Sequence, residues 1–166
     1  MRSGSSWNTV FAYSLSDLSA ARQEFLSPPR GTIHAMPAAP SSPCPCGRPL
    51  AYAACCGRWH DGPQALQAPS AEDLMRSRYS AFALGLLDYL QATWHPSTRP
   101  ATLEPLAAGL RWLGLDVKRH VRQDDDHALV EFVARSKLGG RAERLHETSR
   151  FVRENGRWFY VDGDIA

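Results

Sequence analysis

The hydrophobic positions of this chain change their period once, near residue 113. Before that point, apolar side chains fall on one narrow helical stripe, made of Met75, Tyr79, Phe82 and Leu86. A spacing of three or four residues places side chains on one face of a helix, so this stripe predicts a helix with one buried face. Ser70 lies directly before it, and the acidic residues that follow favour the positive end of a helix.

The same half of the chain predicts two shorter helices. Gly85 interrupts the first helix, and residues 88–93 form a second helical piece that ends before Pro96. Residues 102–110 are expected to form a third and weaker helix. The helices therefore precede every strand that the pattern predicts.

After residue 113, apolar and polar residues alternate, which is the period of a half-buried strand. The alternating apolar positions are Leu113, Leu115 and Val117, and then Ala128, Val130, Phe132 and Ala134. Two more strands are expected over 143–153 and 158–162, and polar turns at 124–126, 139–140 and 155–156 separate the strands. Asn155-Gly156 is the strongest hairpin signal, because both central residues of a type I′ turn need positive φ. Helices followed by antiparallel strands predict an α+β fold.

Composition narrows the class of protein. Hydrophobic residues make up 43% of the 166 residues, which is enough for one core, and the formal net charge of +2 gives no broad attraction to nucleic acid or to an anionic membrane. No apolar stretch approaches the roughly 20 residues of a membrane span, and the N-terminus has no apolar run typical of a signal peptide. We therefore expect a cytoplasmic protein that binds neither membranes nor nucleic acid.

The chain divides into three segments. Residues 1–42 end in a stretch rich in Pro, Ala and Ser and are expected to form a disordered leader. Met36 is a candidate for the true start of translation, and a genuine N-terminal tail is the alternative. Residues 43–62 contain every cysteine of the chain, and residues 63–166 form the α+β domain.

Four cysteines lie within 13 residues, at positions Cys44, Cys46, Cys55 and Cys56. A structural zinc site needs four such soft ligands, although zinc ligands usually come in pairs separated by two to four residues. Unrelated core thiols, a disulfide pair and a redox site are the alternatives. The clustering of the cysteines disfavours unrelated core thiols, and a reducing compartment disfavours a disulfide pair. The lack of a Cys-x-x-Cys sequence disfavours a redox site.

The segment CPCGRPLAYAACCG resembles the SEC-C motif, a short zinc-binding element also found at the C-terminus of the bacterial translocation ATPase SecA. The resemblance implies one structural Zn²⁺ with all four cysteines as ligands, a turn at Gly47, and a short helical turn that carries Tyr52 towards the metal. His60 is the substitute ligand to consider. Arg48-Pro49 and Ala53-Ala54 depart from the usual SEC-C pattern, and the second change removes basic residues through which such motifs meet acidic partners or ribosomes.

Two longer stretches, LMRSRYSAFALGLLDYLQATWHPSTRP and SRFVRENGRWFYVDGD, resemble the YchJ-like bacterial proteins, a family of uncharacterised function. The resemblance covers roughly residues 43–164. It implies a nuclear transport factor 2-like domain, in which helices pack on a curved antiparallel sheet to form a cone, preceded by the SEC-C motif.

Cones of this type often enclose a pocket with a few polar groups. The residues expected to line it are Arg76, Arg78, Tyr79, Tyr89, Trp94, His95, Arg150 and Asp162. A buried guanidinium needs partners, so Arg78 is expected to find a carboxylate or backbone carbonyl oxygens. A structural ion pair with Asp162 or Asp88 is the simpler interpretation of that arginine.

Two further sets of residues have a functional and a structural interpretation. His95 is a candidate general base, although a histidine in such a loop more often closes a helix end. His146, Thr148 and Arg150 share one face of a predicted strand, where they either line a cavity or form a solvated face.

These features predict a zinc protein without enzymatic activity. Its SEC-C segment would bind a protein partner, and its cone would act as a scaffold or bind a small ligand. One alternative is an enzyme that uses the cone pocket for acid–base chemistry on a small molecule, and another is a factor associated with the ribosome or the Sec machinery through the SEC-C motif. An enzyme should bring titratable groups together in the pocket, whereas a binding module should expose a surface on the zinc segment.

Overall fold

Helical elements followed by an antiparallel sheet make up the part of the chain that the computed structural model describes, residues 41–166. The helical elements are η1 (Tyr52–Ala54), α2 (Gly57–His60), α3 (Ala71–Leu84) and α4 (Leu87–Ala92). The strands are β1 (Arg111–Arg122), β2 (His127–Leu138), β3 (Arg141–Glu154) and β4 (Arg157–Ile165). Met36 and all but the last two residues of the expected leader lie outside the described residues.

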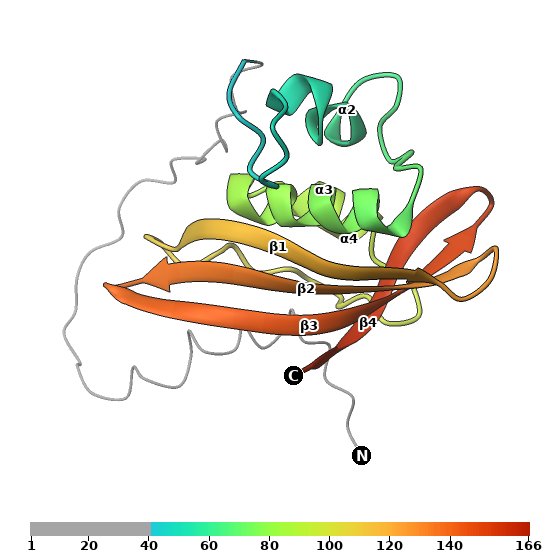
Figure 1. Cartoon of the computed structure of the whole chain (residues 1–166). Helices are drawn as coiled ribbons and strands as arrows, with labels where there is room; N and C mark the ends of the chain where they lie inside the picture. The colour runs from blue at the N-terminus through green and yellow to red at the C-terminus, as the bar shows by residue number, and fades with distance from the viewer. Residues whose placement is uncertain (1–40) are drawn as a thin grey trace.

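The four strands form one antiparallel sheet in the order β1-β2-β3-β4, so each strand pairs with the next along the chain. The predicted hairpin between β3 and β4 is confirmed, with φ of 49° at Asn155 and 78° at Gly156. The sheet is strongly twisted, and β4 crosses the other strands steeply (Figure 1). This twist curves the sheet around the helices.

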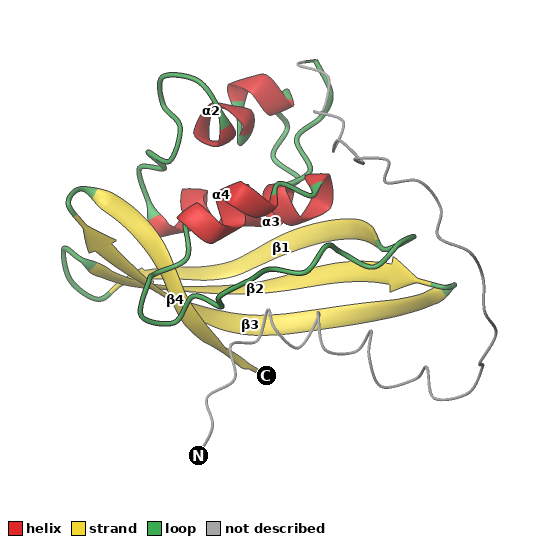
Figure 2. Ribbon diagram, turned by 180° about the vertical axis from the view of Figure 1, so that it is seen from behind, coloured by secondary structure: helices red, strands yellow, loops and turns green. Residues whose placement is uncertain are grey.

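Helix α3 packs its predicted face on the sheet. Its N-cap Ser70 accepts a hydrogen bond from the backbone N–H of Asp73 at 3.1 Å, as the sequence predicts. Met75, Tyr79 and Phe82 are buried on its sheet-facing side. Figures 1 and 2 show α3 and α4 on one face of the sheet, with α2 on the side of α3 away from the sheet. The α+β architecture expected from the sequence is confirmed.

The expected helix over residues 102–110 does not form. This segment is irregular and ends in a turn, in which the N–H of Leu110 donates to the carbonyl oxygen of Ala107 at 3.0 Å. Pro105 lacks an amide hydrogen and disfavours helical backbone at the residue before it, so the apolar spacing around it was misleading. The expected helical piece at 88–93 is present as α4, one residue earlier at each end.

The core lies between the helices and the sheet and is filled by large side chains. Trp94, Phe132 and Tyr160 are fully buried there, and the rings of Trp94 and Tyr160 meet edge to face with centroids 5.1 Å apart. The four cysteines form a second buried cluster above α3. The fold therefore separates an aromatic core from a sulfur-lined cluster.

Candidate metal centre

Four cysteine sulfurs converge above helix α3. The Sγ atoms of Cys44, Cys46, Cys55 and Cys56 all lie within 4.8 Å of one another, and all four residues are buried. Cys46 Sγ and Cys55 Sγ are 3.6 Å apart, and none of the four cysteines is in a disulfide. Four sulfurs at about 2.3 Å from a tetrahedral zinc would be about 3.8 Å apart. The donor set therefore fits one zinc ion held by thiolates.

Two short turns bring the cysteines together. Gly47 adopts φ of 82° and its N–H donates to the carbonyl oxygen of Cys44 at 3.1 Å, which folds back the first pair of cysteines. The 3-10 turn η1 then leads into the second pair, and Tyr52 packs partly against the sulfur cluster. The turn at Gly47 and the helical turn that carries Tyr52 both agree with the expectation from the SEC-C resemblance.

The close approach of the sulfurs shifts the pKa values of three of the thiols in opposite directions. Hydrogen bonds from the thiols of Cys46 and Cys56 lower the pKa of Cys44, whereas burial raises the pKa of Cys55 to about 12. Hydrogen bonds to Cys44 and Cys46, with burial, raise the pKa of Cys56. A divalent cation would remove this imbalance, because each ligand sulfur binds as a thiolate.

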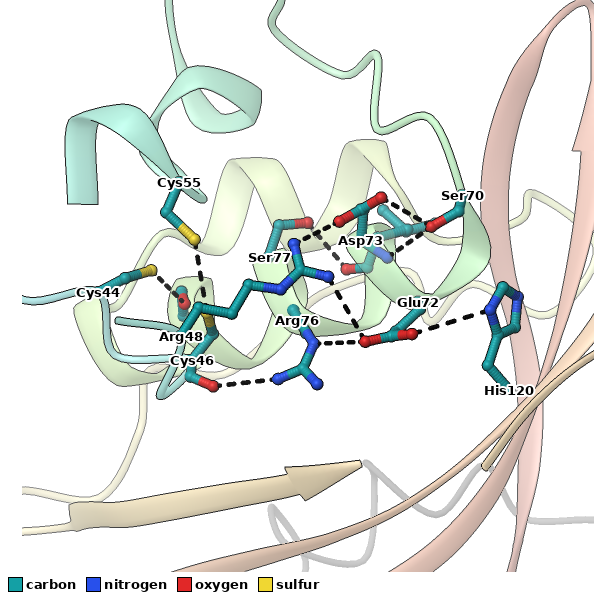
Figure 3. A network of polar contacts seen from close by, with 12 residues as sticks. Cys44, Cys46, Arg48, Cys55, Ser70, Glu72, Asp73, Arg76, Ser77 and His120 are labelled. Carbon is teal, nitrogen blue, oxygen red and sulfur yellow. Dashed lines mark hydrogen bonds and ion pairs between the residues drawn. The ribbon is translucent and has the colours of Figure 1, made fainter. Parts of the chain in front are cut away.

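Two arginines lie between the cysteine loop and the acidic first turn of helix α3. Arg76 Nη1 donates to the carbonyl oxygen of Cys46 at 3.3 Å, and its Nε forms an ion pair with Glu72 at 2.7 Å. Arg48, on the cysteine loop, pairs with Asp73 at 2.6 Å and with Glu72 at 3.4 Å (Figure 3). Both guanidinium groups are themselves paired with carboxylates of α3, so they connect the cysteine loop to the helix without adding net charge beside the sulfurs.

Glu72 of this network is held in its charged form. Burial alone would raise the pKa of Glu72, but the hydrogen bond and charge of Arg76, together with the charge of Arg48, hold it below its usual range. Asp73 also accepts a hydrogen bond from the hydroxyl of Ser70 at 2.7 Å, as Figure 3 shows. The first turn of α3 thus binds the cysteine loop through charged groups.

His60 lies beside the cluster but contacts other residues. Its Nε2 donates to the carbonyl oxygen of Ser77 on α3 at 2.9 Å, and its Nδ1 accepts from the hydroxyl of Tyr52 at 2.7 Å. Both ring nitrogens are occupied, and the group of potential ligands does not include His60. Burial lowers the pKa of His60, which favours the neutral ring that this pair of hydrogen bonds requires.

The sequence did not indicate two other neighbours of the cluster. Ser80 Oγ on α3 lies 3.7 Å from Cys44 Sγ, and Leu115 on β1 packs against the sulfurs. Both lie far from the cysteines along the chain, and no local pattern links them. Arg48 could have been singled out from the sequence, because it departs from the usual SEC-C pattern, and in the structure it binds α3.

The residues expected to line a cone pocket do not gather at one place. Arg78, Tyr79 and Trp94 are buried in the core, Arg76 faces the cysteine segment, and His95 lies in the loop after α4. Tyr89 is buried and shares a hydrogen bond of 2.7 Å with Ser77. Arg150 and Asp162 form an ion pair with each other on β3 and β4.

Arg78 corrects one expectation. It forms no ion pair with Asp162 or Asp88 but donates through Nη1 to the carbonyl oxygen of Leu90 at 2.9 Å and to the hydroxyl of Thr93 at 2.8 Å. Its guanidinium also lies over the ring of Tyr160, 4.7 Å from the centroid. A backbone carbonyl, a hydroxyl and an aromatic ring are therefore its direct partners, and the charge of buried Glu147 also favours its charged form.

The face of β3 that carries His146, Thr148 and Arg150 is the sheet face opposite the core. His146 Nε2 lies 2.8 Å from Glu131 Oε1, and Thr148 lines a shallow hollow of about 140 Å³ with residues of β1 and β2. Pockets for small ligands usually measure 300–1,000 Å³. The hollow is too small for such a ligand as it stands.

Comparison with known proteins identifies relatives across most of the chain. A family model described as the middle, NTF2-like domain of YchJ matches residues 70–163. A UPF0225 protein of Bordetella pertussis is 67% identical over 128 residues, covering 76% of this chain and 96% of that protein. A UPF0225 protein of Methylibium petroleiphilum is 68% identical over 123 residues, covering 74% of this chain and 88% of that protein.

Two solved structures are also similar. The solution structure of a SEC-C motif-containing protein of Rhodopseudomonas palustris has a TM-score of 0.64 and 32% identity, covering 74% of this chain and 98% of that one. The crystal structure of a SEC-C motif-containing protein of Psychrobacter arcticus has a TM-score of 0.61 and 33% identity, covering 74% of this chain and 82% of that one. Within residues 41–166, no helix is long and apolar enough to cross a membrane.

Proposed function

This chain belongs to the YchJ-like UPF0225 family of proteins with a SEC-C motif and an NTF2-like domain, and we propose that it is a zinc-stapled module that binds a protein partner. In this proposal residues 43–62 form the zinc segment and residues 63–166 the NTF2-like domain. The four convergent, buried sulfurs are the observation that carries it.

The zinc ion has a structural role in this proposal. All four ligands come from the protein, so a tetrahedral ion keeps no open position for a water or a substrate. The cysteine segment contributes no strand to the sheet, and its residues Arg48 and His60 bind α3 directly. Zinc would hold the short turns together so that these two side chains reach the helix.

The surface offered to a partner is the loop between the two cysteine pairs. Leu50 lies at its centre with 47% of its surface exposed, next to Pro49. The charge of Arg48 is already compensated by two carboxylates of α3. In this proposal Leu50 is the apolar contact point for a protein partner, and the compensated charge of Arg48 gives no support to electrostatic docking on a ribosome.

The interior of the domain gives less support to acid–base catalysis in a cone pocket. The place expected for such a pocket is occupied by Arg78, Trp94 and Tyr160, which contact one another. Among the described residues, these groups fill the space between α3 and β4.

Metal analysis of the purified full chain tests the zinc proposal. We expect about one zinc per chain, and the Cys55→Ser variant should lose it. A chain that is fully folded and free of metal would refute the assignment.

The partner surface has its own test. Cross-linking in cells followed by mass spectrometry should place a protein partner at the Leu50 loop, and Leu50→Asp should abolish those cross-links. Leu138→Asp is the matched control, because Leu138 is exposed to a similar extent, 39%, but lies at the β2–β3 hairpin. Equal loss in both variants would refute the assignment of the surface.

A further inference from the structure

A serine, a histidine and a glutamate are aligned by hydrogen bonds at the end of the β3–β4 hairpin. Ser97 Oγ lies 2.6 Å from His95 Nδ1, and Glu154 Oε1 lies 3.2 Å from His95 Nε2. The serine and histidine belong to the loop after α4, and the glutamate is the last residue of β3. Segments far apart in the sequence therefore meet at one imidazole ring.

The hydrogen bonds assign the tautomer of the ring. The backbone N–H of Ser97 donates to His95 Nδ1 at 3.3 Å, so Nδ1 carries a lone pair and Nε2 carries the proton. The Nε2–H then donates to the carboxylate of Glu154, and the hydroxyl of Ser97 donates to Nδ1. This is the polarity by which a histidine activates a serine while an acid orients the ring.

The loop that carries the serine and histidine is fixed on β4. The N–H of His95 donates to the carbonyl oxygen of Tyr160 at 2.7 Å, and the N–H of Tyr160 donates to that of Thr93 at 2.9 Å. The hydroxyl of Thr98 donates to the carbonyl oxygen of Val161 at 2.6 Å. Trp94 lies in the core between these bonds, so the next residue, His95, projects to the opposite side.

A phenylalanine ring lies beside the histidine, and a guanidinium lies over that ring. His95 meets the ring of Phe159 edge to face, with centroids 6.1 Å apart, and Arg157 covers the same ring at 5.2 Å. The Phe159 ring offers an apolar surface to a short acyl group.

We propose that Ser97, His95 and Glu154 form a hydrolytic site for small esters. Ser97 Oγ forms a bond to the ester carbonyl carbon as its proton moves to His95 Nδ1. The bond from that carbon to the alcohol oxygen then breaks, and the leaving alcohol takes the proton. Water repeats the sequence on the acyl-serine, which releases the carboxylic acid and restores the hydroxyl. Glu154 acts as a positioning residue, because it holds the ring and stabilises its charged form.

This site is separate from the metal centre and from the filled interior. Ser97 is exposed, so a short ester can reach it without any movement of the fold. The site adds a chemical activity to the zinc-stapled binding module, and neither proposal depends on the other.

Hydrolysis of p-nitrophenyl acetate by the full chain tests the proposal. We expect release of p-nitrophenol and an acetyl group on the Ser97 peptide in mass spectra of the quenched reaction. Ser97→Ala and His95→Gln should each lower the rate about a hundredfold or more. Glu154→Gln should lower the rate less and shift its pH profile, which a purely structural residue would not do.

His127→Gln is the matched control, because His127 also pairs with a carboxylate, that of Asp124 at 2.9 Å, and should leave the rate unchanged. Circular dichroism and zinc content should be the same in every variant. Hydrolysis by Ser97→Ala at the wild-type rate, acetylation at another residue, or a wild-type rate no greater than that of His95→Gln would each overturn the proposal.

Discussion

His60 Nε2 donates a hydrogen bond to the main-chain carbonyl oxygen of Ser77 at 2.9 Å, and this contact joins the cysteine segment to helix α3. The His60 ring also meets Tyr89 edge to face, with centroids 4.5 Å apart. His60, the residue considered as a substitute metal ligand, thus connects the cysteine segment to helices α3 and α4. Its contribution to the stability of the fold can be measured separately from that of the metal.

His60→Ala should destabilise the protein by about 2–3 kcal/mol without loss of zinc. The substitution leaves the hydroxyl of Tyr52 and the carbonyl of Ser77 without this partner and removes a ring contact, each a recognised cause of large losses. Urea unfolding followed by fluorescence measures the stability, and metal analysis measures the zinc. His127→Ala, an exposed histidine, should change stability by no more than about 0.5 kcal/mol. Loss of zinc from His60→Ala would show that the ring is a ligand after all.

The same histidine predicts how stability depends on pH. Burial lowers the pKa of His60 in the folded state, so the unfolded chain binds the proton more readily. Stability should be fully present above the unfolded histidine value of about 6.5 and decline as the pH falls through it towards the lower folded pKa. Urea titrations between pH 8 and the pH at which a chelating dye first detects zinc release measure the effect. His60→Ala should show a flatter profile over this range, and an unchanged slope would contradict the prediction.

Removal of the metal should loosen the cysteine segment before it unfolds the sheet. The segment has no apolar cluster of its own besides the four cysteines, and its Trp59 packs into the core of the domain, most of whose side chains come from α3, α4 and the sheet. Hydrogen exchange after treatment with a chelator should show loss of protection in residues 44–60 first, with β2 and β3 still protected. Simultaneous loss of protection in both regions would show that zinc supports the whole domain.

Much of this architecture could be predicted from the local pattern. The cap at Ser70, the Asn155-Gly156 turn and the presence of the strands are properties of neighbouring residues, and each is confirmed. The alternation fails at Leu113, which is 54% exposed because the register of β1 shifts between Trp112 and Gly114. The segment 102–110 shows the limit of this reasoning. Its apolar spacing suits a helix, but Pro105 removes a hydrogen bond and the segment remains irregular.

The partners of the candidate site residues were harder to predict. The cysteine cluster was visible because its members lie close in sequence, but the contact of Arg48 with Asp73 spans 25 residues. The sequence predicts a carboxylate or backbone carbonyls as partners of Arg78, and the carbonyl oxygen of Leu90 is one of those it binds, together with the hydroxyl of Thr93. The partner that each arginine binds depends on how the helices and strands pack together, and a local sequence pattern contains no information about that packing.

Arg48→Met should lower stability by about 0.5–1 kcal/mol, and the loss should shrink in high salt. The ion pair with Asp73 is partly shielded, with side chains 29% and 16% exposed, but salt still screens it. Arg122→Met is the matched control, because its pair with Asp125 is far more exposed and should be worth almost nothing. Unfolding in 0.1 M and 1 M sodium chloride measures both. An equal loss in the two variants would contradict a specific role for the Arg48 contact.

Gly163→Ala should cost about 1–3 kcal/mol because β4 passes close to a buried glutamate. A methyl group there would clash with the carboxylate of Glu147, with only 2.6 Å to its Cδ and 2.8 Å to its Cγ. Glu147 cannot easily turn away, since its Oε1 accepts hydrogen bonds from Ser149 and Tyr160. In a double-mutant cycle with Glu147→Ala, the combined loss should be smaller than the sum of the two single losses. Additive losses would show that the clash is relieved elsewhere.

Arg78 offers a test of how a buried charge is tolerated without a carboxylate bound to it. Burial lowers its pKa to about 10, and its Nε and Nη2 atoms have no hydrogen-bond partner within the described residues. Arg78→Met removes the charge and keeps an unbranched chain between the aromatic rings, so it should cost no more than about 1.5 kcal/mol. Arg78→Lys keeps a charge that is more strongly hydrated and loses the planar contact with Tyr160, so it should cost about 2 kcal/mol or more. Thermal and urea unfolding measure which of the two variants loses more stability. A larger loss of stability for Arg78→Met than for Arg78→Lys would show that the charge of buried Glu147 stabilises the guanidinium by more than its desolvation costs.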